Sequence, residues 1–130
     1  MKQICISRLD KMGDMILSLP AIKAIKIANP NTKIYILASQ QNAKILTQLN
    51  YIDNIIVIDT SFNLIELFKN LFNLRKLKFD FFFNLSPTFL SYAFCFFSNS
   101  INKATLIFLS RYKKSIFSKL FIRLFSKLYC

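Results

Sequence analysis

The sequence predicts an α/β fold built on an open parallel sheet. Five short apolar runs alternate along the chain with segments whose apolar residues recur at helical spacing. Parallel strands need crossover connections of this kind, which are right-handed almost without exception. The connectivity is therefore Rossmann-like, although the chain has a single glycine and so lacks the glycine fingerprint of dinucleotide-binding folds.

The first strand and helix lie within residues 2–31. In residues 2–7 (KQICIS), Ile4 and Ile6 alternate with their neighbours, which predicts a short buried strand. Residues 8–13 form a polar loop, and a helix is expected from about Asp14 to Ala28, followed by the turn-forming sequence Asn-Pro-Asn. Pro20 predicts a kink in this helix, or a helix that restarts there. The apolar positions at helical spacing are Met15, Ile16, Leu19, Ile22, Ile25 and Ile27.

The later elements follow the same alternation. Residues 33–38 (KIYILA) predict a second strand and residues 41–49 a short helix. Residues 54–59 (NIIVID) are almost wholly apolar, as expected for a third strand covered on both faces. A helix at 64–77 carries cations toward its end, where they complement the helix dipole. The remaining predictions are a strand at 79–85 (FDFFFNL), a helix at 87–97 and a strand at 104–109 (ATLIFL).

The composition excludes several classes of function. The chain has no histidine, which rules out Ser-His-Asp triads, HExxH zinc sites and His-ligated haem. The three cysteines are far apart and form no CxxC, so we expect reduced thiols and a cytoplasmic setting. We also expect the chain to bind no metal or cofactor. There are 18 basic and 6 acidic residues, a formal net charge of +12. The basic residues are scattered and no zinc spacing or RNP motif accompanies them, so we expect no nucleic-acid partner.

Two segments raise the question of membrane contact. Residues 81–102 carry no charge and are long enough to span a bilayer, but their dispersed Asn, Ser and Pro residues suit a strand, turn and helix better. Residues 110–130 place cations beside an apolar helical face. That segment is a basic amphipathic helix on an anionic membrane surface, a helix packed on the core with a solvated basic face, or a helix whose packing partner is missing. The apolar positions are Ile116, Phe117, Leu120, Phe121, Leu124, Phe125 and Leu128.

The loop after the first strand is the candidate site, because ligands of open α/β sheets gather at the carboxyl ends of the strands. It holds Gly13, which predicts a positive φ or the close approach of a ligand to the backbone. Arg8 and Lys11 are suited to phosphate oxygens beside the N–H groups of the following helix. Asp14 is either an N-cap or a general base, and the helix N-terminus would keep it ionised at neutral pH.

Residues 3–108 resemble the N-terminal part of the ADP-heptose:lipopolysaccharide heptosyltransferases, glycosyltransferase family 9. That family begins with a strand, an (R/K)xxxxGD-type loop and the sequence LPA before a helix. Here the corresponding residues are Arg8, Gly13-Asp14 and Leu19-Pro20-Ala21. The sequences NYIDNIIVID and FDFFFNLSPTFLSYAF also resemble the family's third and fourth strands.

The resemblance implies the acceptor-side half of a GT-B fold, in which two Rossmann-like domains face a cleft. It implies inverting, metal-independent transfer of heptose from ADP-heptose to the lipopolysaccharide core. Asp14 would be the base that deprotonates the acceptor hydroxyl, and Arg8 would hold phosphates. Lys11 and Gly13 belong to the same loop, and Ser86 and Thr88 fall in a loop that lines the acceptor side.

The main departure from the family is length, since its enzymes are more than twice this size. The resemblance covers an incomplete N-terminal domain, residues 1–109, followed by the basic segment 110–130. We therefore expect a truncated homologue that lacks the donor-binding domain and is inactive alone, with a separately encoded C-terminal domain as a candidate partner. The alternatives are an inactive remnant and a small basic protein that binds membrane surfaces. Peripheral contact with the cytoplasmic face of the inner membrane is compatible with each.

Overall fold

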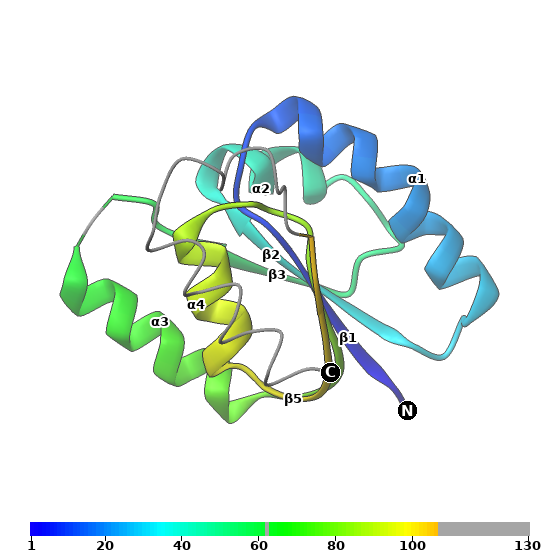
Figure 1. Cartoon of the computed structure of the whole chain (residues 1–130). Coiled ribbons are helices and arrows are strands. Elements are labelled where there is room, and N and C mark those ends of the chain that lie inside the picture. Colours follow the sequence, from blue (N-terminus) through cyan, green and yellow to red (C-terminus); the bar gives the residue numbers. More distant parts are fainter. Residues whose placement is uncertain (62, 107–130) are drawn as a thin grey trace.

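The computed structural model describes residues 1–61 and 63–106 (Figure 1). Strands and helices alternate throughout these residues, as the sequence predicts. The elements are β1 (Gln3–Arg8), α1 (Met12–Ala28), β2 (Lys33–Ser39), α2 (Gln40–Leu46), β3 (Asn54–Ile58), α3 (Leu64–Lys76), β4 (Lys78–Asn84), α4 (Phe89–Phe97) and β5 (Asn99–Thr105). The predicted segment 110–130 lies outside the described residues.

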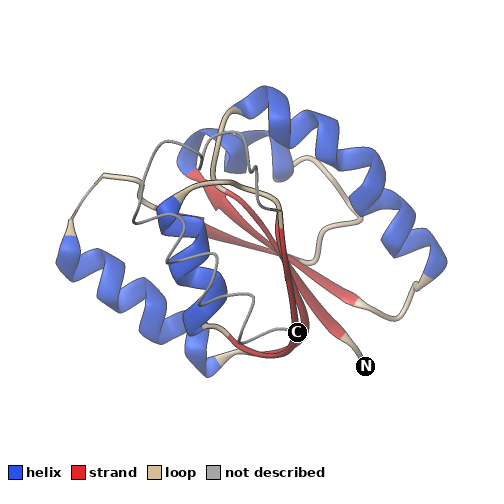
Figure 2. Ribbon diagram, viewed as in Figure 1, coloured by secondary structure: helices blue, strands red, loops and turns tan. Residues whose placement is uncertain are grey.

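The five strands form one sheet in the order β3-β2-β1-β4-β5, and every neighbouring pair is parallel. This confirms the predicted Rossmann-like α/β fold. Helices α1 and α2 cover one face of the sheet and α3 and α4 the other (Figure 2). The strand order reverses direction at β1, which pairs with β2 on one side and β4 on the other. Open α/β sheets place their ligands at this switch point, beyond the carboxyl ends of the strands.

Each face of the sheet has its own apolar core. Under α1 and α2, β1 and β2 bury Ile4, Ile6, Ile34 and Ile36 against Met15 and other helical residues. On the other face, the core contains Cys5, Leu9, Leu37, Ile58, Leu74, Phe79, Phe82, Phe94 and Cys95. Successive strand residues point to opposite faces, so β1 contributes to both cores. Both cores support β1, whose carboxyl end leads into the candidate site.

Two strand predictions need correction. The fifth strand is Asn99–Thr105 rather than 104–109. Residues 99–105 are mostly polar because β5 is the last strand of the sheet, paired only with β4 within the described residues. The apolar run ATLIFL overlaps the end of β5, and its composition resembles a strand more closely than β5 itself does. Strand β3 is not covered on both faces as predicted, because Val57 is half exposed. This strand forms the other edge of the sheet.

The first helix also differs from its prediction. It begins at Met12 rather than Asp14, and it continues through Pro20 without restarting. Proline supplies no N–H, so the helix loses one backbone hydrogen bond there. The uncharged run 81–102 divides among β4, α4 and β5, as its Asn, Ser and Pro residues predict. In the described part of the chain, no helix combines the length and apolarity needed to cross a membrane.

Candidate functional site

Arg8 is the last residue of β1, and its guanidinium lies at the centre of the loop that follows. Its Nε lies 3.1 Å from Oδ1 of Asp10, and its Nη2 lies 3.6 Å from Oδ1 of Asp14. The Nη1 group donates a hydrogen bond to the backbone carbonyl of Leu85, in the loop after β4. The side chain of Arg8 is only 13% exposed, so these contacts replace most of its hydration. Arg8 thus joins two loops at the switch point.

Asp14 lies in the first turn of α1, as its third residue. It is not the N-cap: that residue is Lys11, which has an extended backbone and no side-chain capping bond. Its Oδ1 lies 3.6 Å from Nη2 of Arg8, so the carboxylate faces the Arg8 guanidinium. The side chain of Asp14 is 44% exposed, so its carboxylate is accessible from solvent.

Gly13 adopts no positive φ, so that part of the sequence prediction is wrong. It lies inside the first turn of α1, where helical dihedrals suit any residue. A Cβ added to Gly13 would meet no atom within 4 Å. The space above this turn is therefore open, and close approach of a ligand to the backbone remains a prediction.

Ser86 closes the loop from the β4 side, and it is fully buried. Its hydroxyl accepts a hydrogen bond from the backbone N–H of Leu9 at 2.7 Å and donates one to Oδ1 of Asp10 at 3.1 Å. Its own backbone carbonyl accepts from the hydroxyl of Ser91 at 2.6 Å. The hydroxyl of Ser86 thus holds the Arg8 loop in place from within.

Thr88 is the N-cap of α4. Its hydroxyl accepts from the N–H of Ser91 at 3.3 Å, and the Ser91 hydroxyl in turn accepts from the N–H of Thr88 at 3.4 Å. This reciprocal capping box satisfies two N–H groups that the helix leaves unpaired. Thr88 therefore positions the helix beside Ser86, and a contact of Thr88 with substrate remains a prediction.

Asn42, which sequence reasoning missed, holds the same loop from the side of α2. Its amide nitrogen donates to the backbone carbonyls of Arg8 at 3.2 Å and Asp10 at 3.1 Å. Asn42 is fully buried although it lies in the polar first turn of α2. The sequence carries no signal for this role, because the contact joins residues more than thirty positions apart.

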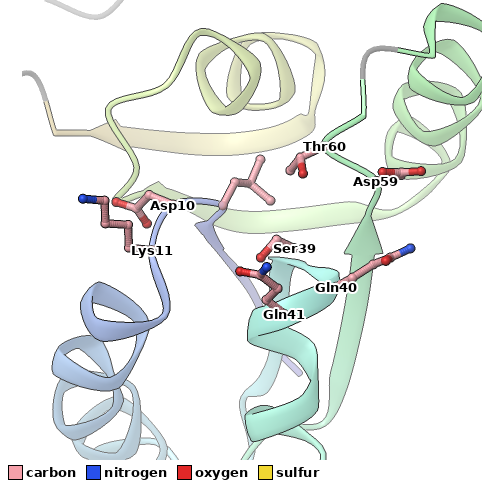
Figure 3. Close-up of a pocket in the computed structure, with 8 residues that line it drawn as sticks. Asp10, Lys11, Ser39, Gln40, Gln41, Asp59 and Thr60 are labelled. Carbon is pink, nitrogen blue, oxygen red and sulfur yellow. The ribbon is translucent and has the colours of Figure 1, made fainter.

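An open pocket of about 410 Å³ lies beyond the carboxyl ends of β1, β2 and β3 (Figure 3). Of the predicted site residues, Lys11 lines it, together with Leu9 and Asp10 of the same loop. The other lining residues come from the ends of β2 and β3: Ser39, Gln40, Gln41, Asp59 and Thr60. The position of these residues after predicted strands is the signal that could have identified them.

Asp59 is the acid that the end of β3 contributes to this pocket, opposite Asp10 of the first loop. The backbone N–H of Ser61 donates to its carboxylate at 2.8 Å and lowers the pKa of Asp59. The pocket thus combines two carboxylates with hydroxyl and amide groups, which suits hydrogen bonding to sugar hydroxyls. Among residues 1–61 and 63–106, no group of three His, Cys, Asp or Glu side chains is arranged to hold a metal ion.

No protein-family model matches the sequence, and no curated protein matches it closely. The fold does match solved structures. A glycosyltransferase family 9 structure from Veillonella parvula aligns with 98% of this chain at 20% identity and a TM-score of 0.73. The E. coli heptosyltransferase WaaC with ADP aligns with 92% at 17% identity and a TM-score of 0.70. The E. coli ADP-heptose lps heptosyltransferase II aligns with 81% at 20% identity and a TM-score of 0.66.

These comparisons define the fold class. The five-stranded parallel sheet and its helices match the GT-B glycosyltransferase fold of family 9 structures. The chain spans about two-fifths of the Veillonella and WaaC proteins, with 41% and 39% of their lengths covered, and 30% of the E. coli heptosyltransferase II. The likeness covers nearly all of this chain and less than half of each of those proteins.

Proposed function

We propose that this chain is the acceptor-side domain of an inverting glycosyltransferase of the family 9 type, with Asp14 as its general base. The observation that carries the proposal is the fold likeness to family 9 structures over 98% of the chain. The exposed carboxylate of Asp14 at the first turn of α1, beside the Arg8 guanidinium, supports the role of base.

In the proposed reaction, the Asp14 carboxylate takes the proton of an acceptor sugar hydroxyl. The hydroxyl oxygen then forms a bond to the anomeric carbon of ADP-heptose. The bond from that carbon to the phosphate oxygen breaks, and its electron pair leaves with ADP. Attack opposite the leaving group inverts the anomeric configuration, and none of these steps requires a metal.

The acceptor is proposed to be the lipopolysaccharide core, at the cytoplasmic face of the inner membrane. Lys11 and the open backbone at Gly13 would contact it directly, and Arg8 would contribute positive charge toward its phosphates. Ser86 and Thr88 would act on the same side. There Ser86 holds the loop that follows Arg8, and Thr88 caps helix α4. The donor, ADP-heptose, would be held by a second domain.

Binding of deacylated lipopolysaccharide core oligosaccharide to the full chain, measured by calorimetry, tests this proposal. We expect the chain to bind the oligosaccharide, and Lys11→Gln to weaken binding about fivefold because a phosphate contact is lost. Asp14→Asn should change affinity much less, because a base contributes mainly in the transition state. Lys23→Gln, an exposed cation elsewhere on α1, is the matched control. Absence of binding would favour an inactive remnant.

A second measurement tests two claims separately: that Asp14 is the base, and that transfer needs a second domain. The chain alone, mixed with ADP-heptose and acceptor, should release no ADP. Release that disappears in Asp14→Asn would show that no second domain is needed while supporting Asp14 as base. Release that persists in Asp14→Asn would contradict the assignment of Asp14.

A further inference from the structure

Helix α3 presents large apolar side chains on its outer surface as well as its inner one. Leu67, Leu71 and Leu74 face the sheet and pack on the core that contains Phe82. The opposite side of the helix carries Leu64, Ile65, Phe68 and Phe72, with exposed fractions of 65%, 80%, 68% and 64%. We call these four residues the α3 stripe. Leu64, Phe68 and Phe72 recur every four residues and Ile65 precedes Phe68 by three, so the four residues share one broad face of the helix.

Cations surround the α3 stripe. Lys69, Arg75 and Lys76 are exposed on the same helix, and Lys78 follows directly in β4. The ammonium of Lys76 lies 4.9 Å from the centre of the Phe72 ring, so charge and aromatic surface adjoin. Glu66 is the one acid within α3. The outer face of α3 is thus both apolar and positively charged.

We propose that α3 binds an anionic lipid surface, with the α3 stripe inserted among the headgroups and the flanking cations on the lipid phosphates. An exposed helix face of this kind, with aromatic and aliphatic residues bordered by Lys and Arg, is what interfacial helices use. Such helices bury their apolar face by about 5–10 Å, and each cation near an anionic surface adds to the attraction. Helix α3 lies on the outside of the molecule, away from α1 (Figure 1).

The charge pattern favours lipid over protein occupants. In a symmetric dimer through α3, the stripes of two copies would meet and bring their flanking cations together. The sequence contains no acid after Asp80, so the charge of segment 110–130 does not complement these cations either. An anionic bilayer supplies both the apolar depth and the opposite charge.

A tryptophan reporter tests the insertion directly, since the natural chain contains no tryptophan. The full-length Phe68→Trp variant is mixed with vesicles of equimolar phosphatidylglycerol and phosphatidylcholine. We expect its emission to shift to the blue and to be quenched by brominated lipid, and added salt should reverse both effects. Leu17→Trp on α1, where the native side chain is 78% exposed, is the matched control and should show neither.

A loss-of-binding experiment complements the reporter. Replacing Phe68 and Phe72 together by serine removes two exposed rings, so the fold should persist while vesicle affinity falls about tenfold or more. The matched double variant Leu17→Ser and Ile27→Ser, with native exposures of 78% and 70%, should stay within about twofold of the natural chain.

Three outcomes would overturn the proposal. The first is absence of binding to the anionic vesicles. The second is binding that survives loss of both phenylalanines, which would place the contact on another segment such as residues 110–130. The third is a blue shift of the Phe68→Trp variant that depends on protein concentration without lipid, which would indicate a second copy. The proposal does not rest on glycosyl transfer, and the vesicle measurements use no sugar substrate, so the two can fail separately.

Discussion

The guanidinium of Arg8 stands between two carboxylates, 3.1 Å from Asp10 and 3.6 Å from Asp14. It also donates to the carbonyl of Leu85, so a single cation connects the loops after β1 and β4. Asp14, the candidate base, therefore shares the Arg8 cation with Asp10 and with the loop that contains Leu85.

Replacing Arg8 by glutamine should destabilise the fold by roughly 2 kcal/mol, because the Leu85 carbonyl loses its charged donor and Asp10 loses its ion-pair partner. Urea unfolding of the full chain measures this change. Lys11→Gln, an exposed cation of the same loop, should stay within about 0.5 kcal/mol. Equal stability of the two variants would mean that the Arg8 contacts do not hold the loops together.

Ser86→Ala should cost about 1–3 kcal/mol, because it leaves the N–H of Leu9 without its buried acceptor. Thr60→Ala removes an exposed hydroxyl and should be nearly neutral. Urea unfolding and oligosaccharide binding are measured on the same variants. Unchanged stability together with lost binding would assign the Ser86 hydroxyl to substrate rather than to the loop.

Asp53 should make the free energy of unfolding depend on pH in the acid range. Burial raises its pKa, but bonds from the Ile34 N–H and the Lys26 ammonium outweigh this effect, so the pKa lies below the ordinary 3.8. A carboxyl whose pKa is lowered on folding stabilises the fold above its unfolded pKa and loses that contribution as the pH falls.

The corresponding variant is Asp53→Asn. Near neutral pH it should be roughly 1 kcal/mol less stable than the natural chain, and the difference should vanish by about pH 2. Urea unfolding across this pH range is the measurement. A difference that stays constant with pH would show that packing, rather than the charge of Asp53, stabilises the turn before β3.

Cys5 and Cys95 should resist thiol reagents in the folded chain. Burial raises the pKa of the Cys5 thiol far above its usual range, and burial raises that of Cys95 to about 11 despite the opposing effect of Lys103. Because the thiolate is the reactive form, neither residue should be modified at mildly alkaline pH. Mass spectrometry of labelled peptides with and without denaturant checks this, and rapid labelling of Cys95 in the native chain would contradict it.

Much of the fold could be predicted because its evidence is local. The alternation of Ile4 and Ile6 in β1, and the cations Arg75 and Lys76 at the end of α3, depend only on neighbouring residues. Most predicted boundaries therefore agree with the structure within about two residues, the usual uncertainty of such assignments. Local evidence failed for β5, because an edge strand needs little apolar surface and so leaves no periodic pattern.

The site was predictable only in part. Arg8, Lys11, Gly13 and Asp14 are neighbours in the chain, so the position of one loop was enough to find them. Gln40 and Asp59 line the same pocket only because β2 and β3 are parallel neighbours, which brings their carboxyl ends together.

The sequence by itself determined the fold class, the exclusion of histidine-dependent sites and the loop before Asp14. Spacing and composition are enough to decide these features. The tertiary structure alone decided that β1 lies between β2 and β4, and with it the contact of Ser86 with Leu9 across 77 positions. It also decided which face of α3 remains exposed. The physical reason is that burial and long-range hydrogen bonds depend on how the helices and strands pack, and no local pattern records that packing.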